Sequence, residues 1–347
     1  MGRLENRSEQ ILKAIVSEYV ATGEPVGSRT LSKRREIGLS AASIRNIMSD
    51  LTDSGFITQP HVSAGRVPTD LGYRFYVDVL LRPGKLETEE EAMIETLLGN
   101  AGLDIRDVLR KSSGVLAGFS RQAGVVASPP ADYTFKSIDF IKVAEDKILV
   151  VLVSTAGIIH NKIIFDEDGI KQETLERYSR MLCDMLKDLD LRQARERIEN
   201  ELNLERTRVD AMLAKVLRLG HSILMVGATR EVFIEGQINI LEDPEFAHIE
   251  KLKAVLVAFE EKSNFLKILD KTLQAKGIQI LIGSEHGVGE LDTCSIVAYP
   301  IRTKKSCLGS IAVVGPKRMD YQKVVPVVSA TARIITKIVK RIVESDV

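Results

Sequence analysis

The spacing of hydrophobic residues predicts three helices within the first 55 residues. Asn6 and Glu9 resemble a capping pair at the start of the first helix, and Gly23 ends it. Ser28 and Ser40 are placed to cap two shorter helices, because a serine hydroxyl accepts a hydrogen bond from an otherwise unpaired backbone N–H. The hydrophobic positions of the first helix recur at helical spacing: Ile11, Ile15, Val16, Tyr19 and Val20.

The third predicted helix has two different faces. Its hydrophobic stripe consists of Ile44, Ile47, Met48 and Leu51, and Gly55 follows where a left-handed residue would end the helix. A short helix, a turn at Gly38 and this second helix predict a helix-turn-helix unit, whose second helix lies in the DNA major groove. The opposite face carries small and polar residues: Ala42, Ser43, Arg45, Asn46 and Ser49.

The residues after Gly55 predict a β-hairpin, which gives the layout of a winged helix. Phe-Ile-Thr-Gln is followed by a turn-rich loop over residues 60–65 and then by Arg66-Val-Pro. Arg66 at the returning strand is a candidate for a phosphate or for the minor groove. His61 in the loop is a candidate for the DNA backbone or simply a solvated loop histidine.

The candidate DNA contacts divide into two groups. Arg45 and Asn46 can bond base edges bidentately, arginine to guanine and asparagine to adenine. The other residues expected at the bases are Ser40, Ala42 and Ser43, and Ser49 on the exposed face is a further candidate DNA contact. Those expected at the phosphates are Arg29, Lys33 and Arg34, together with Arg66.

The charge of the N-terminal region tempers this interpretation. Ten Lys and Arg residues stand against nine Asp and Glu residues over residues 1–80, so the region as a whole is not basic. Six of the cations lie between residues 28 and 66 with three acids, which makes a basic patch. A small helical subdomain that packs on another protein segment is the alternative.

The rest of the chain predicts an α+β protein after a linker at Arg82-Pro83-Gly84. Three strands, a long helical tract and three further strands suggest one antiparallel-sheet domain interrupted by an insertion. The helical tract carries a hydrophobic stripe that is a dimer interface or a core; its residues are Ile198, Leu202, Val209, Met212, Leu213 and Val216. The expected strands are 137–143, 147–154, 158–165, 232–241, 278–282, 294–301 and 308–314, and the expected helices span about 88–122 (two helices), 171–220, 247–261, 264–275 and 321–343.

Composition is that of a soluble globular protein with two or three domains. The 347 residues are 44% hydrophobic and 28% charged, with a formal net charge of zero, so no global field draws the chain to nucleic acid or membrane. The first twenty residues lack a signal-peptide core, and no apolar run reaches the ~18 residues of a membrane span. Three scattered cysteines fit reduced thiols, so we expect a cytoplasmic protein.

The sequence carries no enzymatic signature. There is no phosphate-binding P-loop and no dinucleotide fingerprint, and the glycine-rich residues 283–289 lack a following helix. Glu285 and His286 could be an acid and base, but no nucleophile is spaced to match them. The histidines and cysteines show no local metal-ligand motif, although a site assembled from distant parts stays open. We therefore expect no enzyme activity, no cofactor and no metal.

Two segments closely resemble the HrcA family of heat-inducible transcription repressors. They are NRSEQILKAIVSEYVATGEPVGSRTLSKR and LSAASIRNIMSDLTDSGFITQPHVSAGRVPTDLGYRFYVD, with weaker likeness at GVVASPP and INILEDPEF. The resemblance implies a winged-helix DNA-binding domain, here residues 1–82, followed by a GAF-like domain that carries an inserted dimerisation domain. We place the two GAF-like parts at 88–169 and 276–347, and the insertion at 170–275.

The family resemblance also implies a function. It implies a homodimer that represses chaperonin and heat-shock operons at an inverted-repeat DNA operator, the CIRCE element, and is released on heat stress. It names the chaperonin GroEL as the partner that maintains activity. The alternative is a winged-helix regulator whose GAF-like body senses a small molecule.

Overall fold

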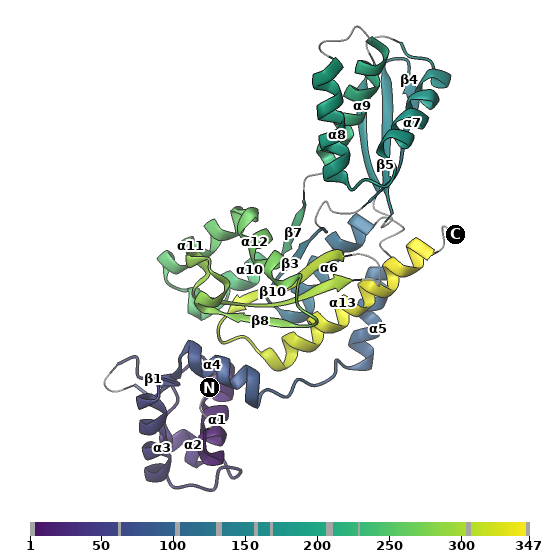
Figure 1. Cartoon of the computed structure of the whole chain (residues 1–347). Coiled ribbons are helices and arrows are strands. Elements are labelled where there is room, and N and C mark those ends of the chain that lie inside the picture. Colours follow the sequence, from purple (N-terminus) through teal and green to yellow (C-terminus); the bar gives the residue numbers. More distant parts are fainter. Residues whose placement is uncertain are drawn as a thin grey trace.

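The chain forms three units in a row (Figure 1). The N-terminal unit comprises residues 4–80. The central unit contains a five-stranded sheet, and the inserted unit, residues 134–227, leaves and re-enters it between two of its strands. The computed structural model describes residues 4–61, 64–100, 105–129, 134–155, 159–166, 169–205, 211–227, 230–302 and 307–344. Within them, no helix is long and apolar enough to cross a membrane.

The N-terminal unit is helical with one short hairpin. Gly55, at a φ of 77°, turns the chain after the third helix as expected. Helix α4 packs on this unit through a T-shaped contact between Phe56 and Phe75, whose ring centroids lie 5.4 Å apart. The elements are α1 (Asn6–Thr22), α2 (Ser28–Ser32), α3 (Ala41–Asp53), β1 (Ile57–Thr58), β2 (Val67–Pro68), α4 (Asp70–Phe75) and the π-helical turn η1 (Tyr76–Leu80).

Helix starts confirm one of the three expected caps. The Ser40 hydroxyl accepts a hydrogen bond from the backbone N–H of Ser43 and caps α3. The expected cap at Ser28 is wrong, because Gly27 occupies the N-cap position and Ser28 is already helical. The expected capping pair of the first helix is also wrong, since Asn6 lies inside α1 and no side chain caps it.

The central unit has three layers, an antiparallel sheet between two layers of helices. The strand order is β7-β3-β10-β9-β8, so β10 lies in the middle and pairs with β3 and β9. Helices α5, α6 and α13 lie on one face and α10–α12 on the other (Figure 1). The elements are α5 (Thr88–Gly99), α6 (Ile105–Ser120), β3 (Ala123–Ala127), β7 (Val232–Glu235), α10 (Gln237–Leu241), η2 (Pro244–Phe246), α11 (Ile249–Glu260), α12 (Lys262–Thr272), β8 (Gln279–Ile282), η3 (Gly283–His286), η4 (Gly289–Leu291), β9 (Cys294–Arg302), β10 (Cys307–Pro316) and α13 (Tyr321–Glu344).

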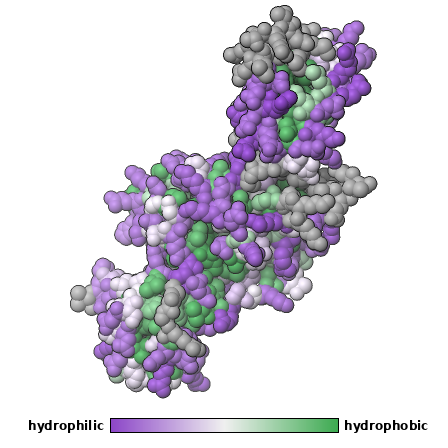
Figure 2. Space-filling model, in the orientation of Figure 1, coloured by the Kyte–Doolittle hydropathy of each residue, from purple (hydrophilic) through white to green (hydrophobic). Residues whose placement is uncertain are grey.

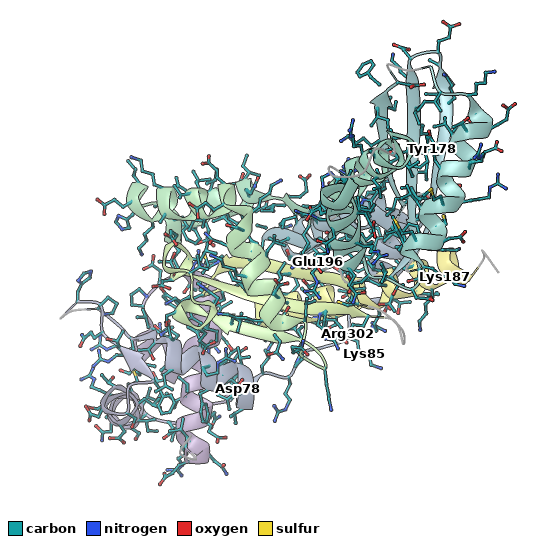
Figure 3. The ribbon with its side chains drawn as sticks, turned by 45° about the horizontal axis from the view of Figure 1, so that its top comes forward. Asp78, Lys85, Tyr178, Lys187, Glu196 and Arg302 are labelled. Carbon is teal, nitrogen blue, oxygen red and sulfur yellow. The ribbon has the colours of Figure 1, made fainter. Side chains whose placement is uncertain are left out.

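The inserted unit has two layers. Its three strands form a meander in the order β4-β5-β6, and the side chains of Ile138, Phe140 and Val150 bury one face of the sheet under the helices. Figure 3 shows this unit from another side, with Tyr178, Lys187 and Glu196 marked on its helical layer. The elements are β4 (Phe135–Ala144), β5 (Lys147–Ser154), β6 (Ile159–Phe165), α7 (Gln172–Leu186), α8 (Leu191–Glu205) and α9 (Ala211–Gly227).

The protein therefore combines helices with antiparallel sheets, as the expected α+β class requires. Two expectations about its strands are wrong. The strands near 137–165 do not join the sheet of the C-terminal strands; they form a sheet of their own. The expected insertion boundaries at 170 and 275 therefore differ from the residues that leave the central sheet. The expected strand 232–241 ends at Glu235, because Gly236 has a φ of 76° and starts α10.

The helical stripe in the inserted unit is a core. Of the expected stripe, Ile198 and Val216 are fully buried and Leu202 is partly buried, and all three belong to the hydrophobic cluster that includes Leu182 of α7. The described residues of the stripe therefore belong to the core of this unit. Val209 and the side chains of Met212 and Leu213 lie outside the described part.

The opposite face of the inserted sheet is uncovered within the described residues. Its cross-strand rows include Ile141, Leu149 and Ile163, which are paired neighbours on β4, β5 and β6. Ile163 is 58% exposed and Phe165 is 73% exposed. Apolar residues in adjacent strands at such exposure are typical of an interaction surface rather than of scattered surface residues.

We expect Leu182→Ala to destabilise the inserted unit selectively. Leu182 is fully buried in its helical layer, and truncating a buried leucine costs about 2–5 kcal/mol of unfolding free energy. Because the inserted unit has a sheet of its own, differential scanning calorimetry should show a transition that shifts to lower temperature while a second transition stays in place. A single transition that moves as a whole would contradict separate units.

Candidate nucleic-acid interface

Helix α3 presents one bare face to solvent. Ile44, Met48 and Leu51 are 0%, 4% and 1% exposed, which fixes the roll of the helix against the N-terminal unit. The residues predicted on the opposite face are all exposed: Ala42, Ser43, Arg45, Asn46 and Ser49. Within the described residues, the side chains of Arg45 and Asn46 make no recorded hydrogen bond or ion pair. Their donors and acceptors are therefore available to a partner.

Ser40 and Ser43 work together at the start of α3. Ser40 Oγ accepts from the Ser43 backbone N–H at 3.1 Å and lies 3.0 Å from Ser43 Oγ. The Ser40 oxygen is thus engaged in capping, so its main effect is to set where α3 begins. The first turn of α3 also brings unpaired backbone N–H groups to the same end, which favours a nearby anion such as a phosphate.

Three of the four cations expected at phosphates lie on or just after α2, and their surroundings differ. Arg29 and Lys33 are exposed on and just after α2. Arg34 forms an ion pair with Glu18 of α1 and lies 3.7 Å from Glu36, so much of its charge is compensated inside the unit. Arg29 and Lys33 therefore remain the better candidates for phosphate contacts.

The hairpin is tied to α3 rather than free. Arg66 Nε donates to Thr52 Oγ1 at 3.2 Å, and the Thr52 hydroxyl donates to the Met48 carbonyl at 2.7 Å. The backbone of Arg66 also exchanges two hydrogen bonds of 2.9 Å with Val26. Arg66 thus lies half-buried beside the C-terminal half of α3.

His61 is exposed in the hairpin loop. The Gln59 side-chain amide donates to the Ala64 carbonyl at 3.0 Å and holds the two arms of the loop together. Residues 62 and 63, at the tip, lie outside the described part. His61 is thus presented to solvent, where a DNA backbone could meet it.

Sequence reasoning missed three residues that shape this surface: Glu18, Thr52 and Val26. Each acts on a candidate contact residue 14 to 40 positions away in the chain. Local spacing carries no signal for such pairs, because they form only when the helices and the hairpin pack. Because of these contacts, Arg34 and Arg66 help to hold the N-terminal unit together as well as being candidates for DNA contact.

The loop with Glu285 and His286 has a structural role. His286 is 1% exposed; its Nε2 bonds the Leu291 carbonyl at 2.9 Å and its Nδ1 accepts from the Val288 N–H at 3.3 Å. Burial lowers its pKa. Glu285 is paired with Arg74. Both side chains are thus committed to packing, and the described residues hold no cluster of three or more His, Cys, Asp or Glu that could bind a metal.

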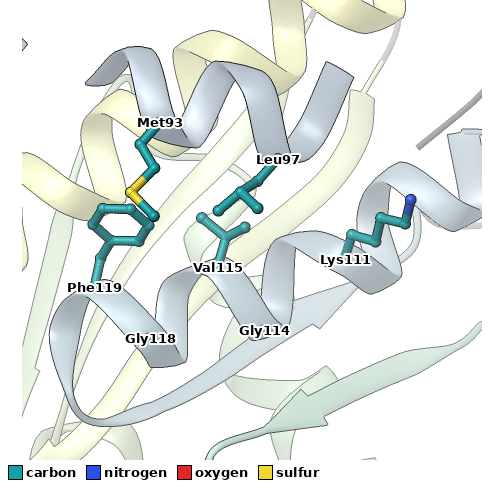
Figure 4. A pocket seen from close by; sticks show the side chains of 7 residues that line it. All are labelled: Met93, Leu97, Lys111, Gly114, Val115, Gly118 and Phe119. Carbon is teal, nitrogen blue, oxygen red and sulfur yellow. The ribbon is translucent and has the colours of Figure 1, made fainter. Parts of the chain in front are cut away.

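An open groove of about 600 Å³ lies between α5 and α6 (Figure 4). Met93, Leu97, Val115 and Phe119 line it, with Gly114 and Gly118 along α6 and Lys111 at one end. Small-molecule sites combine an apolar lining with several converging polar groups. Here Lys111 is the one charged residue in the lining, so the groove does not have the makeup of a metabolite site.

Comparisons with known proteins give one consistent result. The family model described as the HrcA protein C-terminal domain matches residues 106–325. The chain is 40% identical over 343 residues to the heat-inducible transcription repressor HrcA of Syntrophobacter fumaroxidans, covering 98% of this chain and 99% of that protein. It is 39% identical over 341 residues to the protein of the same name from Geobacter sulfurreducens, with coverage of 98% and 99%.

A solved structure has a similar fold over the whole chain. It is the crystal structure of a hypothetical protein at 2.2 Å resolution, with a TM-score of 0.64 and 23% sequence identity. The match covers 99% of this chain and 98% of that one. At this identity the likeness concerns the fold alone.

We expect Ser40→Ala to destabilise the N-terminal unit by about 0.5–2 kcal/mol, because α3 loses its only recorded side-chain cap. Ser40→Asp should keep most of the stability, since a carboxylate also accepts from the first-turn N–H groups. Urea unfolding followed by circular dichroism measures both variants. Equal stability of the alanine and aspartate variants would contradict a capping role.

Proposed function

The chain belongs to the HrcA family of heat-inducible transcription repressors, and on this basis we propose that it represses heat-shock operons by binding an inverted-repeat operator as a homodimer. It is a transcription regulator of the heat-stress response. The observation that carries the proposal for DNA is the bare face of α3. Arg45 and Asn46 stand there without recorded partners among the described residues, opposite a fully buried stripe.

The N-terminal unit acts in this proposal as a winged helix. Helix α3 enters the major groove, and Arg45 and Asn46 bond base edges. Ala42, Ser43 and Ser49 allow close approach and add short polar contacts. Arg29 and Lys33 bind phosphates, Arg34 contributes less because of its pair with Glu18, and Arg66 and His61 meet the backbone or the minor groove from the hairpin.

The proposed operator is the CIRCE inverted repeat, because a twofold-symmetric homodimer matches a twofold-symmetric site. The uncovered face of the inserted sheet offers the dimer surface. Its apolar residues lie in cross-strand register, and two-fold packing of this face would bury Ile163 and Phe165. Ile198 and Val216 of the helical stripe are already buried within the unit. In this proposal the central unit is the GAF-like domain that carries the insertion.

Chaperonin control completes the proposal. Three packed units joined by short connections can lose contacts between units while each core persists, which exposes apolar surface. The chaperonin GroEL would bind that state and return it to the competent fold, and heat would divert the chaperonin. If operator occupancy of the purified protein were unchanged across the heat-shock range with or without chaperonin, this part of the proposal would fail.

The alternative is a regulator whose central unit senses a small molecule. The apolar groove between α5 and α6 is the candidate pocket, and its lining lacks the converging polar groups such a site needs. A metabolite that raises the melting temperature in a saturable way would favour this alternative.

We expect Arg45→Ala and Lys33→Ala to weaken DNA binding in different ways. Loss of a bidentate base contact should cost about 1–3 kcal/mol and relax discrimination at one base pair. Loss of a phosphate contact should weaken all sequences alike and reduce the salt slope by about one. Fluorescence anisotropy over a salt series measures both, and identical behaviour of the two variants would contradict this division.

We expect Ile163→Asp to convert the dimer into a monomer, because a carboxylate buried in an apolar interface is strongly unfavourable. Met181→Asp is the matched control: Met181 is a 42% exposed apolar residue on the helical side of the same unit. Sedimentation velocity measures both. A dimer that persists in Ile163→Asp but is lost in Met181→Asp would place the interface on the helices instead.

A further inference from the structure

Covalent linkage alone does not orient the N-terminal unit on the central unit. Residues 81–87, between η1 and α5, have no regular secondary structure, and Gly84 has no atom within 4 Å of the position that a Cβ would occupy. Figure 3 marks Lys85 in this segment and Asp78 just before it. Seven extended residues span up to about 23 Å, so non-covalent contacts must fix the orientation.

The first of these contacts is made by Arg74 of α4. Its Nε donates to Glu285 Oε1 at 2.9 Å, its Nη2 donates to Glu285 Oε2 and, at 2.6 Å, to the Ile280 carbonyl. Its Nη1 lies 3.1 Å from Asp78 Oδ1. Burial alone would raise the pKa of Glu285, but hydrogen bonds from Arg74 and the Ile282 N–H outweigh it and lower the pKa. A bidentate pair of this kind defines an angle as well as a distance.

The second contact joins the start of α4 to the end of the central sheet. Lys317 Nζ lies 2.5 Å from Asp70 Oδ1. Gly283, at a φ of 55°, makes room for this pair, because a Cβ there would lie 2.9 Å from Lys317 Nζ and even closer to Asp70. The absence of a side chain at residue 283 thus serves a contact between two units.

The third contact meets the end of α1. Arg318 is 13% exposed at its side chain and pairs with Asp243 at 2.6 Å. A Cβ on Gly23, the C-cap residue of α1, would lie 3.2 Å from Arg318 Nη1. The guanidinium therefore lies at the negative end of the helix dipole.

Aromatic packing completes this junction. The rings of Tyr73 in α4 and Tyr321 in α13 lie 6.4 Å apart and are 2% and 1% exposed. In Figure 2, hydrophobic residues continue from the N-terminal unit onto the adjoining part of the central unit. Two polar contacts, the close approach of Arg318 to the end of α1 and the buried aromatic pair together hold the N-terminal unit in one orientation.

We infer that this junction, formed by Asp70, Arg74, Gly283, Glu285, Lys317 and Arg318, sets which half-site spacing of the operator the protein selects. The inference rests on the proposed homodimer and inverted repeat. If each α3 is held at a fixed angle to its central unit, the dimer fixes the distance and rotation between its two recognition helices. Duplexes with another spacing then cannot engage both helices, and the gain from the second contact is lost.

The test is a spacer series. Inverted-repeat duplexes carry the natural central spacer or one changed by two base pairs, which turns one half-site by about 70° relative to the other. The unaltered protein should lose about tenfold or more in affinity for the changed spacers. The double variant Asp70→Asn with Glu285→Gln should lose less than about threefold in affinity for the changed spacers, because a loosened junction lets each N-terminal unit change its orientation.

Affinity for a duplex with a single half-site should stay unchanged in the variant, which shows that the N-terminal unit is folded. Glu91→Gln with Glu95→Gln is the matched control, since it removes two ion pairs that lie within the central unit, with Arg333 and Lys337. It should keep the native spacer profile. The inference would be overturned if the junction variant had the same spacer profile as the unaltered protein. It would also be overturned if the control variant broadened the profile as much as the junction variant does.

Charge exchange provides the rescue. Asp70→Lys alone should broaden the spacer profile, and Asp70→Lys with Lys317→Asp should restore selectivity, which a change in general stability would not do. Failure of the exchange to restore any selectivity would count against the inference.

If the unaltered protein did not prefer the inverted repeat over a scrambled duplex, the proposed function itself would fail. A clear preference for the repeat, with no effect of the junction variants, would remove only this inference.

Discussion

The burial of Ile44, Met48 and Leu51 is the interaction on which the proposed DNA-binding surface depends. Helix α3 has only 13 residues, and these three contacts decide which way it is rolled. Because the helical repeat is 3.6 residues, their burial places Arg45 and Asn46 on the solvent side without any further device. A one-residue shift of the hydrophobic stripe would turn the helix by about 100° and bury Arg45 and Ser49.

The remaining structure transmits that orientation. The hairpin is hydrogen-bonded to α3 through Arg66 and Thr52. Helix α4 joins the N-terminal unit to the central unit through the ion pairs of Asp70 and Arg74. Within the described residues, the inserted unit has an apolar sheet face without a covering layer at the far end of the molecule. In the proposed function, DNA contact, orientation and association use separate surfaces, so one can change while the others persist.

Sequence patterns predicted where helices and strands lie in the chain better than they predicted which elements pack or pair with one another. The roll of α3, its Ser40 cap and the end at Gly55 follow from local chemistry, and the structure confirms them. The strands near 137–165 were also expected, but alternation of apolar residues does not say which sheet they join. The early end of β7 depends on the left-handed conformation of Gly236, which the surrounding β-prone residues conceal.

For the candidate site, the exposed residues of α3 were predictable because helical periodicity alone separates its faces. The engagement of Arg34 by Glu18 and of Arg66 by Thr52 was not, since both need packing between distant segments. The same holds for the junction: nothing in the residues around Asp70 indicates a lysine 247 positions later as its partner.

The most direct measurement of the central claim is a titration of the purified protein at fixed salt against the inverted repeat, with a scrambled duplex of the same composition beside it. If the protein binds the operator as a dimer, it should prefer the repeat by about 10³ or more, and changing one half-site should abolish this preference. Equal weak binding to both duplexes, with chaperonin present or absent, would contradict it.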